Sequence, residues 1–169
     1  MKGTYLLILR LDTDLHDLSI GRLGSFHFTR GHYLYVGSAF GSGGLAARLA
    51  YHHQPVKAHP HWHIDYVRPY ADIVETWAVY CAVRLEQVWV EALDAMPDMT
   101  SPVRKFGASD SRCYSHLLYT SERPEIDMLT EALLSGLARC TAPLPDLTLD
   151  ISTYDDNEQY KQQRLSSTA

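Results

Sequence analysis

The chain has 169 residues, of which 46% are hydrophobic and 21% are charged, which is typical of one globular domain with its own core. No apolar run approaches the ~20 residues that a membrane-spanning helix needs, and three widely separated cysteines exclude a disulfide framework. The net charge of −5 argues against a protein that binds nucleic acid over its whole surface, because phosphate contacts need Lys and Arg.

The charges are distributed unevenly along the chain. Residues 1–68 carry seven Lys or Arg and four Asp or Glu, whereas residues 69–120 carry four and seven, and residues 121–169 carry four and nine. The first segment, which carries the motifs, is therefore basic, and this weakens the objection that the overall negative charge raises against nucleic-acid binding. The chain begins with an apolar stretch similar to a signal peptide, but Arg10 and Asp12 interrupt it. We therefore expect a cytoplasmic protein.

The first elements are strands. Residues 4–11 form a continuous apolar run that predicts a buried central strand. A polar loop is expected over residues 12–17, followed by a short strand at residues 18–20. Aromatic residues alternate with other residues in 26–35, which predicts a hairpin with its turn near Arg30-Gly31.

Residues 33–52 change from a strand pattern to a helix pattern. Gly37 and the Gly-Ser-Gly-Gly run that follows break the strand, because glycine tolerates positive φ and a close approach of the backbone. Apolar residues then recur at helical spacing and predict a helix over residues 44–53. Arg48 and His52 are four positions apart and therefore share one side of this helix.

The remaining elements complete an α+β pattern. Residues 62–67 fit either a short helix or an extended segment. The further patterns predict a strand at 73–83, a helix at 86–95, a loop at 101–115, a strand at 116–119 and an amphipathic helix at 124–140. After Thr141 prolines and acidic clusters interrupt any pattern, and residues 155–169 are polar and expected to be disordered. We predict a small, mostly antiparallel sheet flanked by helices over 1–140, with a C-terminal helix and a polar extension at 141–169.

Short phrases in this order carry a resemblance to a known family. Gly3-Thr4-Tyr5 and Tyr35-Val36-Gly37 lie on predicted strands, and Gly43-Gly-Leu-x-x-Arg48 follows with a histidine four residues later. This arrangement resembles the GIY-YIG nucleases, most closely their small stand-alone Uri-type subgroup. Further phrases of the subgroup are Tyr35-Val-Gly-Ser-Ala39, His61-Trp-His-Ile-Asp-Tyr66, Phe106-Gly-Ala-Ser-Asp110 and Ser115-His-Leu. The resemblance covers about Gly3 to Tyr119 and implies a metal-dependent endonuclease that acts on nucleic acid, expected to be DNA.

Hydrolysis of a phosphodiester requires offset of the phosphate charge, activation of a water and stabilisation of the leaving oxygen. Arg48 suits the first task, because its planar guanidinium can hold two phosphate oxygens. The resemblance implies that Tyr35 is the general base and Tyr5 its hydrogen-bonded partner. A phenol has a pKa of about 10, so this role needs positive charge nearby. His52 has two equal interpretations: proton transfer or phosphate contact, or an interaction with the helix dipole.

The resemblance also implies one carboxylate that holds a divalent cation, on a helix after the third strand. The matching phrase is Leu85-Glu86-x-x-Trp89, so Glu86 is the expected ligand for Mg²⁺ or Mn²⁺. Glu91 is the competitor, but it lies about 500° further around the helix and points elsewhere. Gly37 and Ser38, at the end of the Tyr-x-Gly strand, are expected to contact the substrate.

The histidine-rich stretch permits two interpretations. His59, His61 and His63 alternate as in a zinc-binding tract, although no cysteine pair accompanies them. We favour a polar wall of the substrate cleft formed by His61, His63 and Asp65. The resemblance adds Ser109 and Asp110, in a loop where the family places a polar residue near the metal. The expected Asn is absent from this loop, which leaves its role open.

Three functions remain after this comparison of patterns. The first is a metal-dependent nuclease, and the second is a binding module for nucleic acid or protein that has kept the fold without turnover. The third is a zinc-binding protein. No appended reader domain is recognisable, which predicts weak sequence preference or a protein partner that delivers the substrate.

Overall fold

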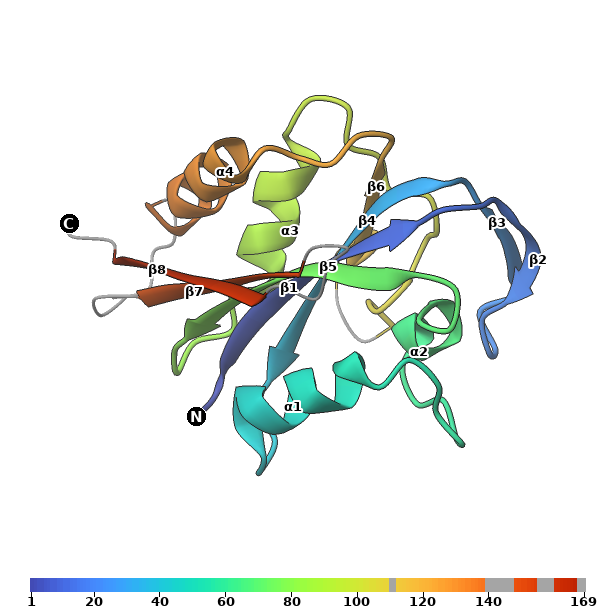
Figure 1. Ribbon diagram of the computed structural model, residues 1–169, viewed down its shortest axis with the longest axis horizontal. Coiled ribbons are helices and arrows are strands. Elements are labelled where there is room, and N and C mark those ends of the chain that lie inside the picture. The colour runs from blue at the N-terminus through green and yellow to red at the C-terminus, as the bar shows by residue number, and fades with distance from the viewer. Residues whose placement is uncertain (110–111, 139–147, 155–159, 167–169) are drawn as a thin grey trace.

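The structure of the chain is a computed structural model that describes residues 1–109, 112–138, 148–154 and 160–166 (Figure 1). In chain order its elements are β1 Gly3–Leu11, β2 Leu15–Ser19, β3 Ser25–Phe28, β4 Gly31–Ala39, α1 Gly44–His53, α2 His63–Val67, β5 Asp72–Tyr80, α3 Glu86–Asp94, β6 Leu117–Thr120, α4 Ile126–Ala138, β7 Thr148–Tyr154 and β8 Tyr160–Ser166. The α+β prediction is confirmed. None of the helices in these described ranges has the length and apolar content to cross a bilayer.

The larger sheet is antiparallel throughout, and its described strands follow the order β6-β4-β1-β5-β7-β8. β1 lies at its centre, with Leu6 opposite Val36 of β4 on one side and Trp77 of β5 on the other. This confirms the central strand that the apolar run 4–11 predicts. Hydrogen bonds to strands on both sides satisfy the backbone groups of this buried strand.

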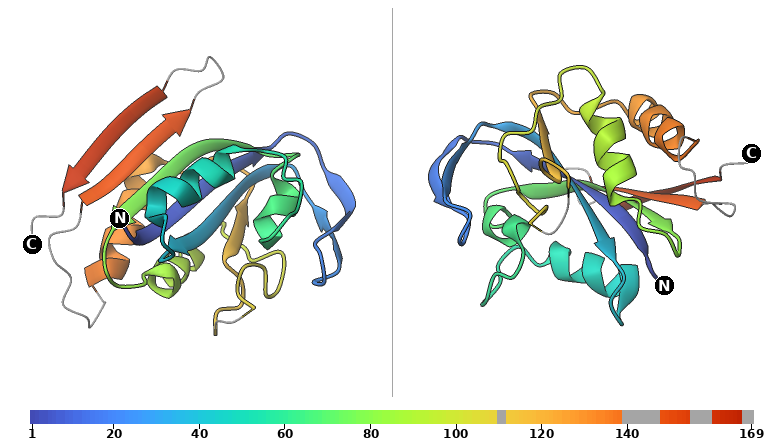
Figure 2. Two further views of the ribbon diagram at one scale, coloured as in Figure 1. Left: turned by 90° about the horizontal axis from the view of Figure 1, so that it is seen from below. Right: turned by 180° about the vertical axis from the view of Figure 1, so that it is seen from behind.

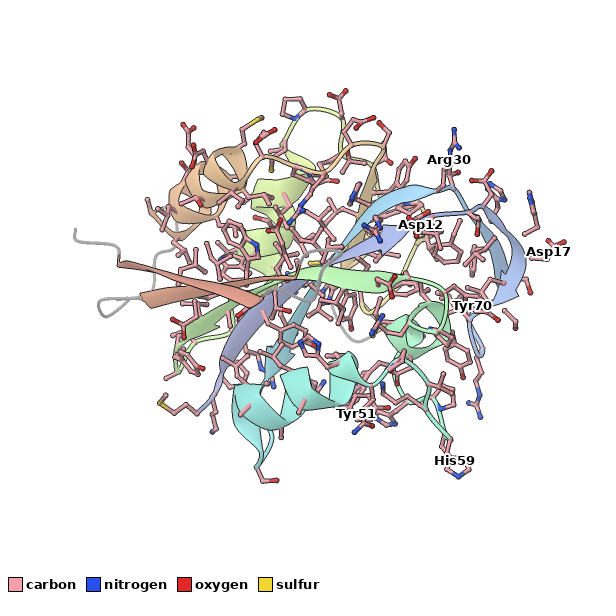
Figure 3. All side chains as sticks on the ribbon, in the orientation of Figure 1. Asp12, Asp17, Arg30, Tyr51, His59 and Tyr70 are labelled. Carbon is pink, nitrogen blue, oxygen red and sulfur yellow. The ribbon has the colours of Figure 1, made fainter. Side chains whose placement is uncertain are left out.

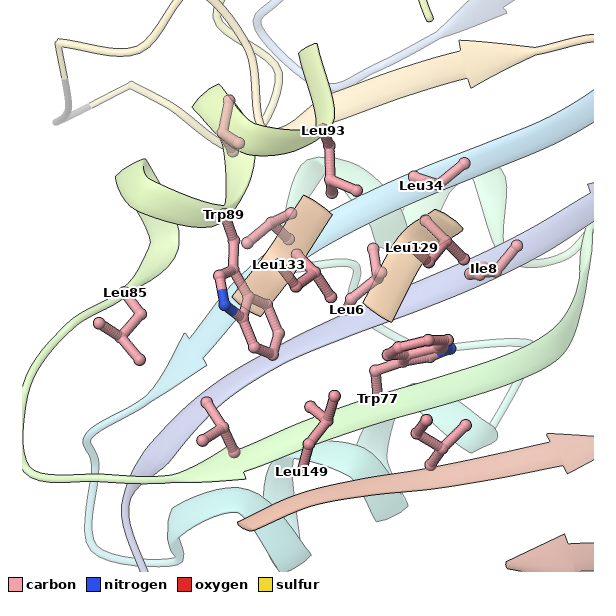
Figure 4. Packing of buried hydrophobic residues seen from close by; sticks show 14 of the residues in the cluster. Leu6, Ile8, Leu34, Trp77, Leu85, Trp89, Leu93, Leu129, Leu133 and Leu149 are labelled. Carbon is pink, nitrogen blue, oxygen red and sulfur yellow. The ribbon is translucent and has the colours of Figure 1, made fainter. Parts of the chain in front are cut away.

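Helices cover both faces of the sheet. α3 and α4 lie on one face, and α1 and α2 lie on the other (Figures 1 and 2). Leu6 packs against Trp89 of α3 and Leu133 of α4 (Figure 4). Tyr5 belongs to the opposite cluster, together with Leu45 of α1. Because successive strand residues point to opposite faces, the position of Leu6 in the α3–α4 core requires Tyr5 to face α1.

The predicted hairpin over residues 26–35 is wrong. β3 pairs with β2 in a separate two-stranded sheet, whereas β4 pairs with β1 and β6. Gly31 begins β4 with φ +142°, and a Cβ there would lie 2.8 Å from the Thr120 carbonyl oxygen. Alternation of side chains fixes which face a residue takes but not which strand it pairs with. β2 also begins at Leu15, inside the expected loop.

The C-terminal segment was expected to lack regular structure, yet it adds β7 and β8 to the sheet. β7 pairs with β5, and Ile151 lies opposite Trp77. Leu149 and Ile151 are buried in the α3–α4 core and alternate with polar residues. The expectation of disorder is therefore wrong for residues 160–166. The short alternation after Thr148 was the available signal for β7.

The other elements follow the sequence closely. Predicted helices at 44–53, 86–95 and 124–140 are confirmed as α1, α3 and α4, and the predicted strands at 73–83 and 116–119 as β5 and β6. The segment 62–67, which the sequence left open, contains the short helix α2.

Candidate active site

A cavity of about 250 Å³ lies where the beginning of β1, the end of β4, α1 and the beginning of α3 meet. Its lining residues are Tyr5, Tyr35, Gly37, Ser38, Phe40, Gly41, Arg48, Trp62, Arg84, Glu86, Gly107 and His116. Six of these residues are ones that the sequence analysis chose as candidates for the site: Tyr5, Tyr35, Gly37, Ser38, Arg48 and Glu86. The four that the proposed chemistry needs most, Tyr5, Tyr35, Arg48 and Glu86, are all among them.

The two glycine-tyrosine phrases form one structural unit. Tyr5 and Gly37 are directly opposite each other in the β1–β4 pair. A Cβ on Gly37 would lie 2.4 Å from the Tyr5 hydroxyl oxygen, so the phenol occupies the space that any other residue at 37 would fill. The ring centroids of Tyr5 and Tyr35 are 6.4 Å apart. The glycine of the second phrase thus makes room for the tyrosine of the first.

Gly37→Ala is expected to displace the Tyr5 phenol and to lower the free energy of unfolding by about 1–3 kcal/mol, as overpacking of a dense core does. Urea unfolding measures the change. Gly41→Ala is the matched control, because a Cβ on Gly41 meets nothing within 4 Å. We expect it to change the stability by less than about 0.5 kcal/mol. Equal stability of the two variants would contradict the packing of Tyr5 on Gly37.

Tyr5 forms a hydrogen bond with His52, which does not line the cavity. The Tyr5 hydroxyl oxygen lies 2.8 Å from His52 Nε2, and both side chains are buried. Burial lowers the pKa of His52 to about 3, and the positive charge of Arg48 acts in the same direction against the opposing charge of Asp65. The imidazole is therefore neutral near pH 7, and the tautomer with an unprotonated Nε2 lets Tyr5 donate to it.

His52 does not line the cavity, so its contact with the site runs through Tyr5. His52 therefore presents no surface in the cavity for a phosphate, whereas proton transfer through Tyr5 stays a prediction. His52 does lie in the last turn of α1, but its lowered pKa leaves the ring without the positive charge that would strengthen an interaction with the helix dipole. The structure assigns His52 a third role, which is to fix the hydroxyl of Tyr5.

Arg48 projects from α1 into the cavity, where its guanidinium carbon lies 3.9 Å from the ring centroid of Trp62. This stacking holds the planar cation in place. Trp62 immediately precedes α2 and lies inside the phrase 61–66, but the sequence analysis did not assign it to the site. Its place within that phrase was the one feature of the sequence that could have indicated a role in the site.

Burial raises the pKa of both cavity phenols. For Tyr5, burial and the neighbouring Tyr35 raise the pKa, and the charge of Arg48 opposes them. For Tyr35, burial raises the pKa, Arg48 lowers it, and Glu86 raises it again. Among the described residues, no group hydrogen-bonds to the Tyr35 hydroxyl. Tyr35 is therefore the phenol that is available to contact a water in the cavity, whereas Tyr5 is engaged with His52.

Glu86 is the first residue of α3 and, among the described residues, the one carboxylate that lines the cavity. Glu91 is exposed, accepts a hydrogen bond from Gln87, and is not among the lining residues, as the helix geometry predicts. A single carboxylate in a polar cavity suits Mg²⁺ or Mn²⁺, hard cations that keep several waters and bind through one or two carboxylates. This donor set fits the expected cation, whereas a closed zinc site needs more ligands.

The zinc interpretation of the histidine stretch is not supported. In the part of the chain that the structure describes, no group of three or more His, Cys, Asp or Glu side chains could hold a metal ion. His59 lies at the outer end of the loop between α1 and α2 and points away from the molecule (Figure 3). His63 is engaged elsewhere, because its Nδ1 accepts a hydrogen bond from the Gly107 amide at 3.0 Å.

The expected polar wall of His61, His63 and Asp65 is also wrong, because none of the three lines the cavity. Asp65 is 1% exposed. Its Oδ2 accepts hydrogen bonds from the backbone amides of His61 at 2.8 Å and Trp62 at 2.9 Å and from the Tyr51 hydroxyl at 2.9 Å. The carboxylate therefore satisfies free amides at the start of α2, as N-terminal acceptors do.

The loop before β6 contributes residues that the sequence analysis did not choose. Ser109 is exposed and does not line the cavity, and Asp110 lies outside the described residues. Gly107 and His116 line it instead. Gly107 has a φ of +68°, and a Cβ there would lie 3.0 Å from the Tyr35 ring. The hydrogen bond from its amide to His63 places this glycine against Tyr35.

One family model, described as "Domain of unknown function DUF123", matches residues 4–139. No curated protein and no solved structure matches the chain significantly. The matched range includes every residue that lines the cavity and ends before β7.

Proposed function

The chain belongs to the DUF123 family, whose description assigns no reaction, and from the residues of its cavity we propose that the protein is a metal-dependent endonuclease that hydrolyses phosphodiester bonds of DNA. One observation carries the proposal: Tyr5, Tyr35, Arg48 and Glu86, which are far apart in the sequence, line a single cavity. The resemblance of the phrases around them to those of GIY-YIG nucleases adds support.

Each residue has a role in this proposal. Arg48 holds the scissile phosphate, because its fork can bond two phosphate oxygens and its charge persists at every relevant pH. Tyr35 orients the attacking water and, as the phenolate, accepts its proton while the water oxygen bonds to phosphorus and the bond from phosphorus to the leaving oxygen breaks. Tyr5, fixed by His52, forms the adjoining wall. Glu86 holds the cation, Mg²⁺ or Mn²⁺, whose chemistry when bound is to neutralise charge on the phosphate and on the leaving oxygen.

The test is nicking of supercoiled plasmid DNA by the purified chain with Mg²⁺ or Mn²⁺. We expect cleavage by the wild type, and a loss of about 10²-fold or more in Glu86→Gln, because the charge that holds the cation is gone. Glu91→Gln is the matched control on the same helix, outside the cavity, and should cleave like the wild type. Equal cleavage by the wild type and Glu86→Gln would overturn the assignment.

The cleavage rate is expected to depend on pH through Tyr35. Burial raises the pKa of this phenol, so the reactive phenolate is a minor form that increases about tenfold per pH unit. The logarithm of the single-turnover rate should therefore rise with a slope of about 1 between about pH 7 and 9. His52, whose pKa is about 3, should add no inflection near the ordinary histidine value of about 6.5.

The control for this profile is Tyr35→Phe, which removes the hydroxyl and keeps the ring. We expect no measurable cleavage from it at any pH in this range. A pH-independent rate in the wild type, or a Tyr35→Phe variant that cleaves at the wild-type rate, would contradict the role of Tyr35.

A binding module without turnover is the second candidate. The observation that favours it is the raised pKa of both cavity phenols, because a neutral phenol is a poor base. Salt-dependent DNA binding that persists in Glu86→Gln, without cleavage by any metal form of the wild type, would select this function.

A further inference from the structure

Arg84 is a second cation of the cavity, and the roles described above do not use it. It lies between β5 and α3 and lines the cavity with Arg48 and Glu86. Its side chain is 64% exposed and therefore accessible from solution. No motif in the sequence singled it out.

Two contacts at the end of β4 orient the Arg84 guanidinium. Nη1 donates a hydrogen bond to the Ser38 hydroxyl oxygen at 3.0 Å. The guanidinium carbon lies 4.7 Å from the ring centroid of Phe40. Fixing an exposed arginine in one conformation costs side-chain entropy, and an arginine that serves only solubility gains nothing in return. These two contacts therefore hold the cation ready at the cavity wall.

The two arginines are held in similar ways by different supports. Arg48 stacks on Trp62 and Arg84 stacks on Phe40, and they come from α1 and from the loop before α3. Among the lining residues that the structure describes, Arg48 and Arg84 are the arginines and Glu86 is the one carboxylate. The whole chain carries −5. Two arginines at one cavity of an acidic protein favour an anionic ligand there.

The nearest acidic group leaves Arg84 free to take another partner. Its Nη1 lies 3.7 Å from Glu86 Oε2. Because this distance is long for an ion pair and the Arg84 side chain is open to water and salt, the contact holds Arg84 only weakly, although Glu86 itself is only 21% exposed. A phosphate offers a guanidinium two charged oxygens in matching geometry. Exchange of Glu86 for a phosphate would also leave that carboxylate free for a cation.

We propose that Arg84 binds a second phosphate of the substrate, next to the one that Arg48 holds, so that the cavity takes two consecutive phosphates of one nucleic acid strand. The two arginines come from different elements and stack on different aromatic rings, Trp62 and Phe40. This arrangement favours two phosphates of one strand over a single phosphate ion. This inference rests on the proposed function for the place of the first phosphate.

The test is the salt dependence of DNA binding. The affinity of the full chain for fluorescein-labelled oligothymidylate is measured by anisotropy over a series of KCl concentrations, in EDTA so that no cleavage occurs. Each phosphate contact on a single strand contributes about 0.7 to the slope of log K against log salt. Arg84→Gln is expected to reduce the slope by about 0.7, and Arg84→Lys to preserve it, because the charge remains.

Arg30→Gln is the matched control. This exposed arginine lies at the β3–β4 turn, far from Tyr51 of α1 (Figure 3), and its removal should leave the slope unchanged. A slope in Arg84→Gln equal to that of the wild type overturns the inference, as does a wild type with no salt-dependent binding. If both arginines held one phosphate, the slope would also stay unchanged in Arg84→Gln.

The two proposals fail in distinguishable ways. If the salt slope depends on Arg84 but the wild type never nicks plasmid, the second phosphate contact stands and the nuclease proposal falls. If the wild type nicks plasmid but Arg84→Gln has the same salt slope as the wild type, the nuclease proposal stands and the second phosphate contact falls.

Discussion

Arg48→Ala is expected to lower the single-turnover rate of DNA cleavage by about 10²–10³-fold, the loss typical of removing one group that stabilises transition-state charge. Two effects of the guanidinium disappear together. The phosphate loses its charged partner, and the pKa of Tyr35 loses the influence that lowers it most. Because the side chain is only half-buried on α1, the fold should survive the substitution.

Arg48→Lys separates the charge from the shape of the guanidinium. Lysine keeps the positive charge but cannot form the two-pronged contact with phosphate, and it stacks less well on Trp62. We expect a rate between those of the wild type and Arg48→Ala. Arg30→Ala, at a distant and exposed arginine, controls for loss of positive charge as such. Cleavage by Arg48→Ala at the wild-type rate would exclude Arg48 from the reaction.

The central part of the fold could be predicted because local patterns determine it. Period-2 alternation in β1 places Tyr5 and Leu6 on opposite faces, and helical spacing defines α1. The partner of β3 could not be predicted in this way. Its choice of β2 over β4 depends on the turn at Gly31, where the chain leaves one sheet and enters the other. Such a choice is made by contacts far apart in the sequence.

The site could be predicted where a phrase of the resemblance marks the residue. The phrase Gly43-Gly-Leu-x-x-Arg48 led to Arg48 and the phrase Leu85-Glu86-x-x-Trp89 led to Glu86, and both residues line the cavity. Asp65 shows the opposite case, because a carboxylate serves equally well as a helix cap or as a substrate contact. Backbone amides of His61 and Trp62 decide between them. Only the folded chain reveals where those amides point.

Glu75 is a buried charge that no sequence pattern indicated. It lies on β5 with no exposed surface. Trp77 Nε1 donates a hydrogen bond to its Oε2 at 2.8 Å, and Arg123 Nε donates to its Oε1 at 2.8 Å. Arg123 belongs to the segment between β6 and α4. The pair therefore connects the central sheet to the chain that leads into α4.

Arg123→Ala is expected to lower the free energy of unfolding by about 3 kcal/mol, because it leaves the Glu75 carboxylate buried without its cation. Glu75→Gln should cost less, since the amide oxygen can still accept from Trp77 and the half-exposed Arg123 can turn to water. The variant that combines Glu75→Gln with Arg123→Ala should then be more stable than Arg123→Ala alone, because it buries no unpaired carboxylate. Urea unfolding of the three variants measures these differences, with the exposed Arg104→Ala as the control. If the double variant were as unstable as the sum of the two single losses, the destabilisation would come from lost packing of Arg123 and not from an unpaired charge.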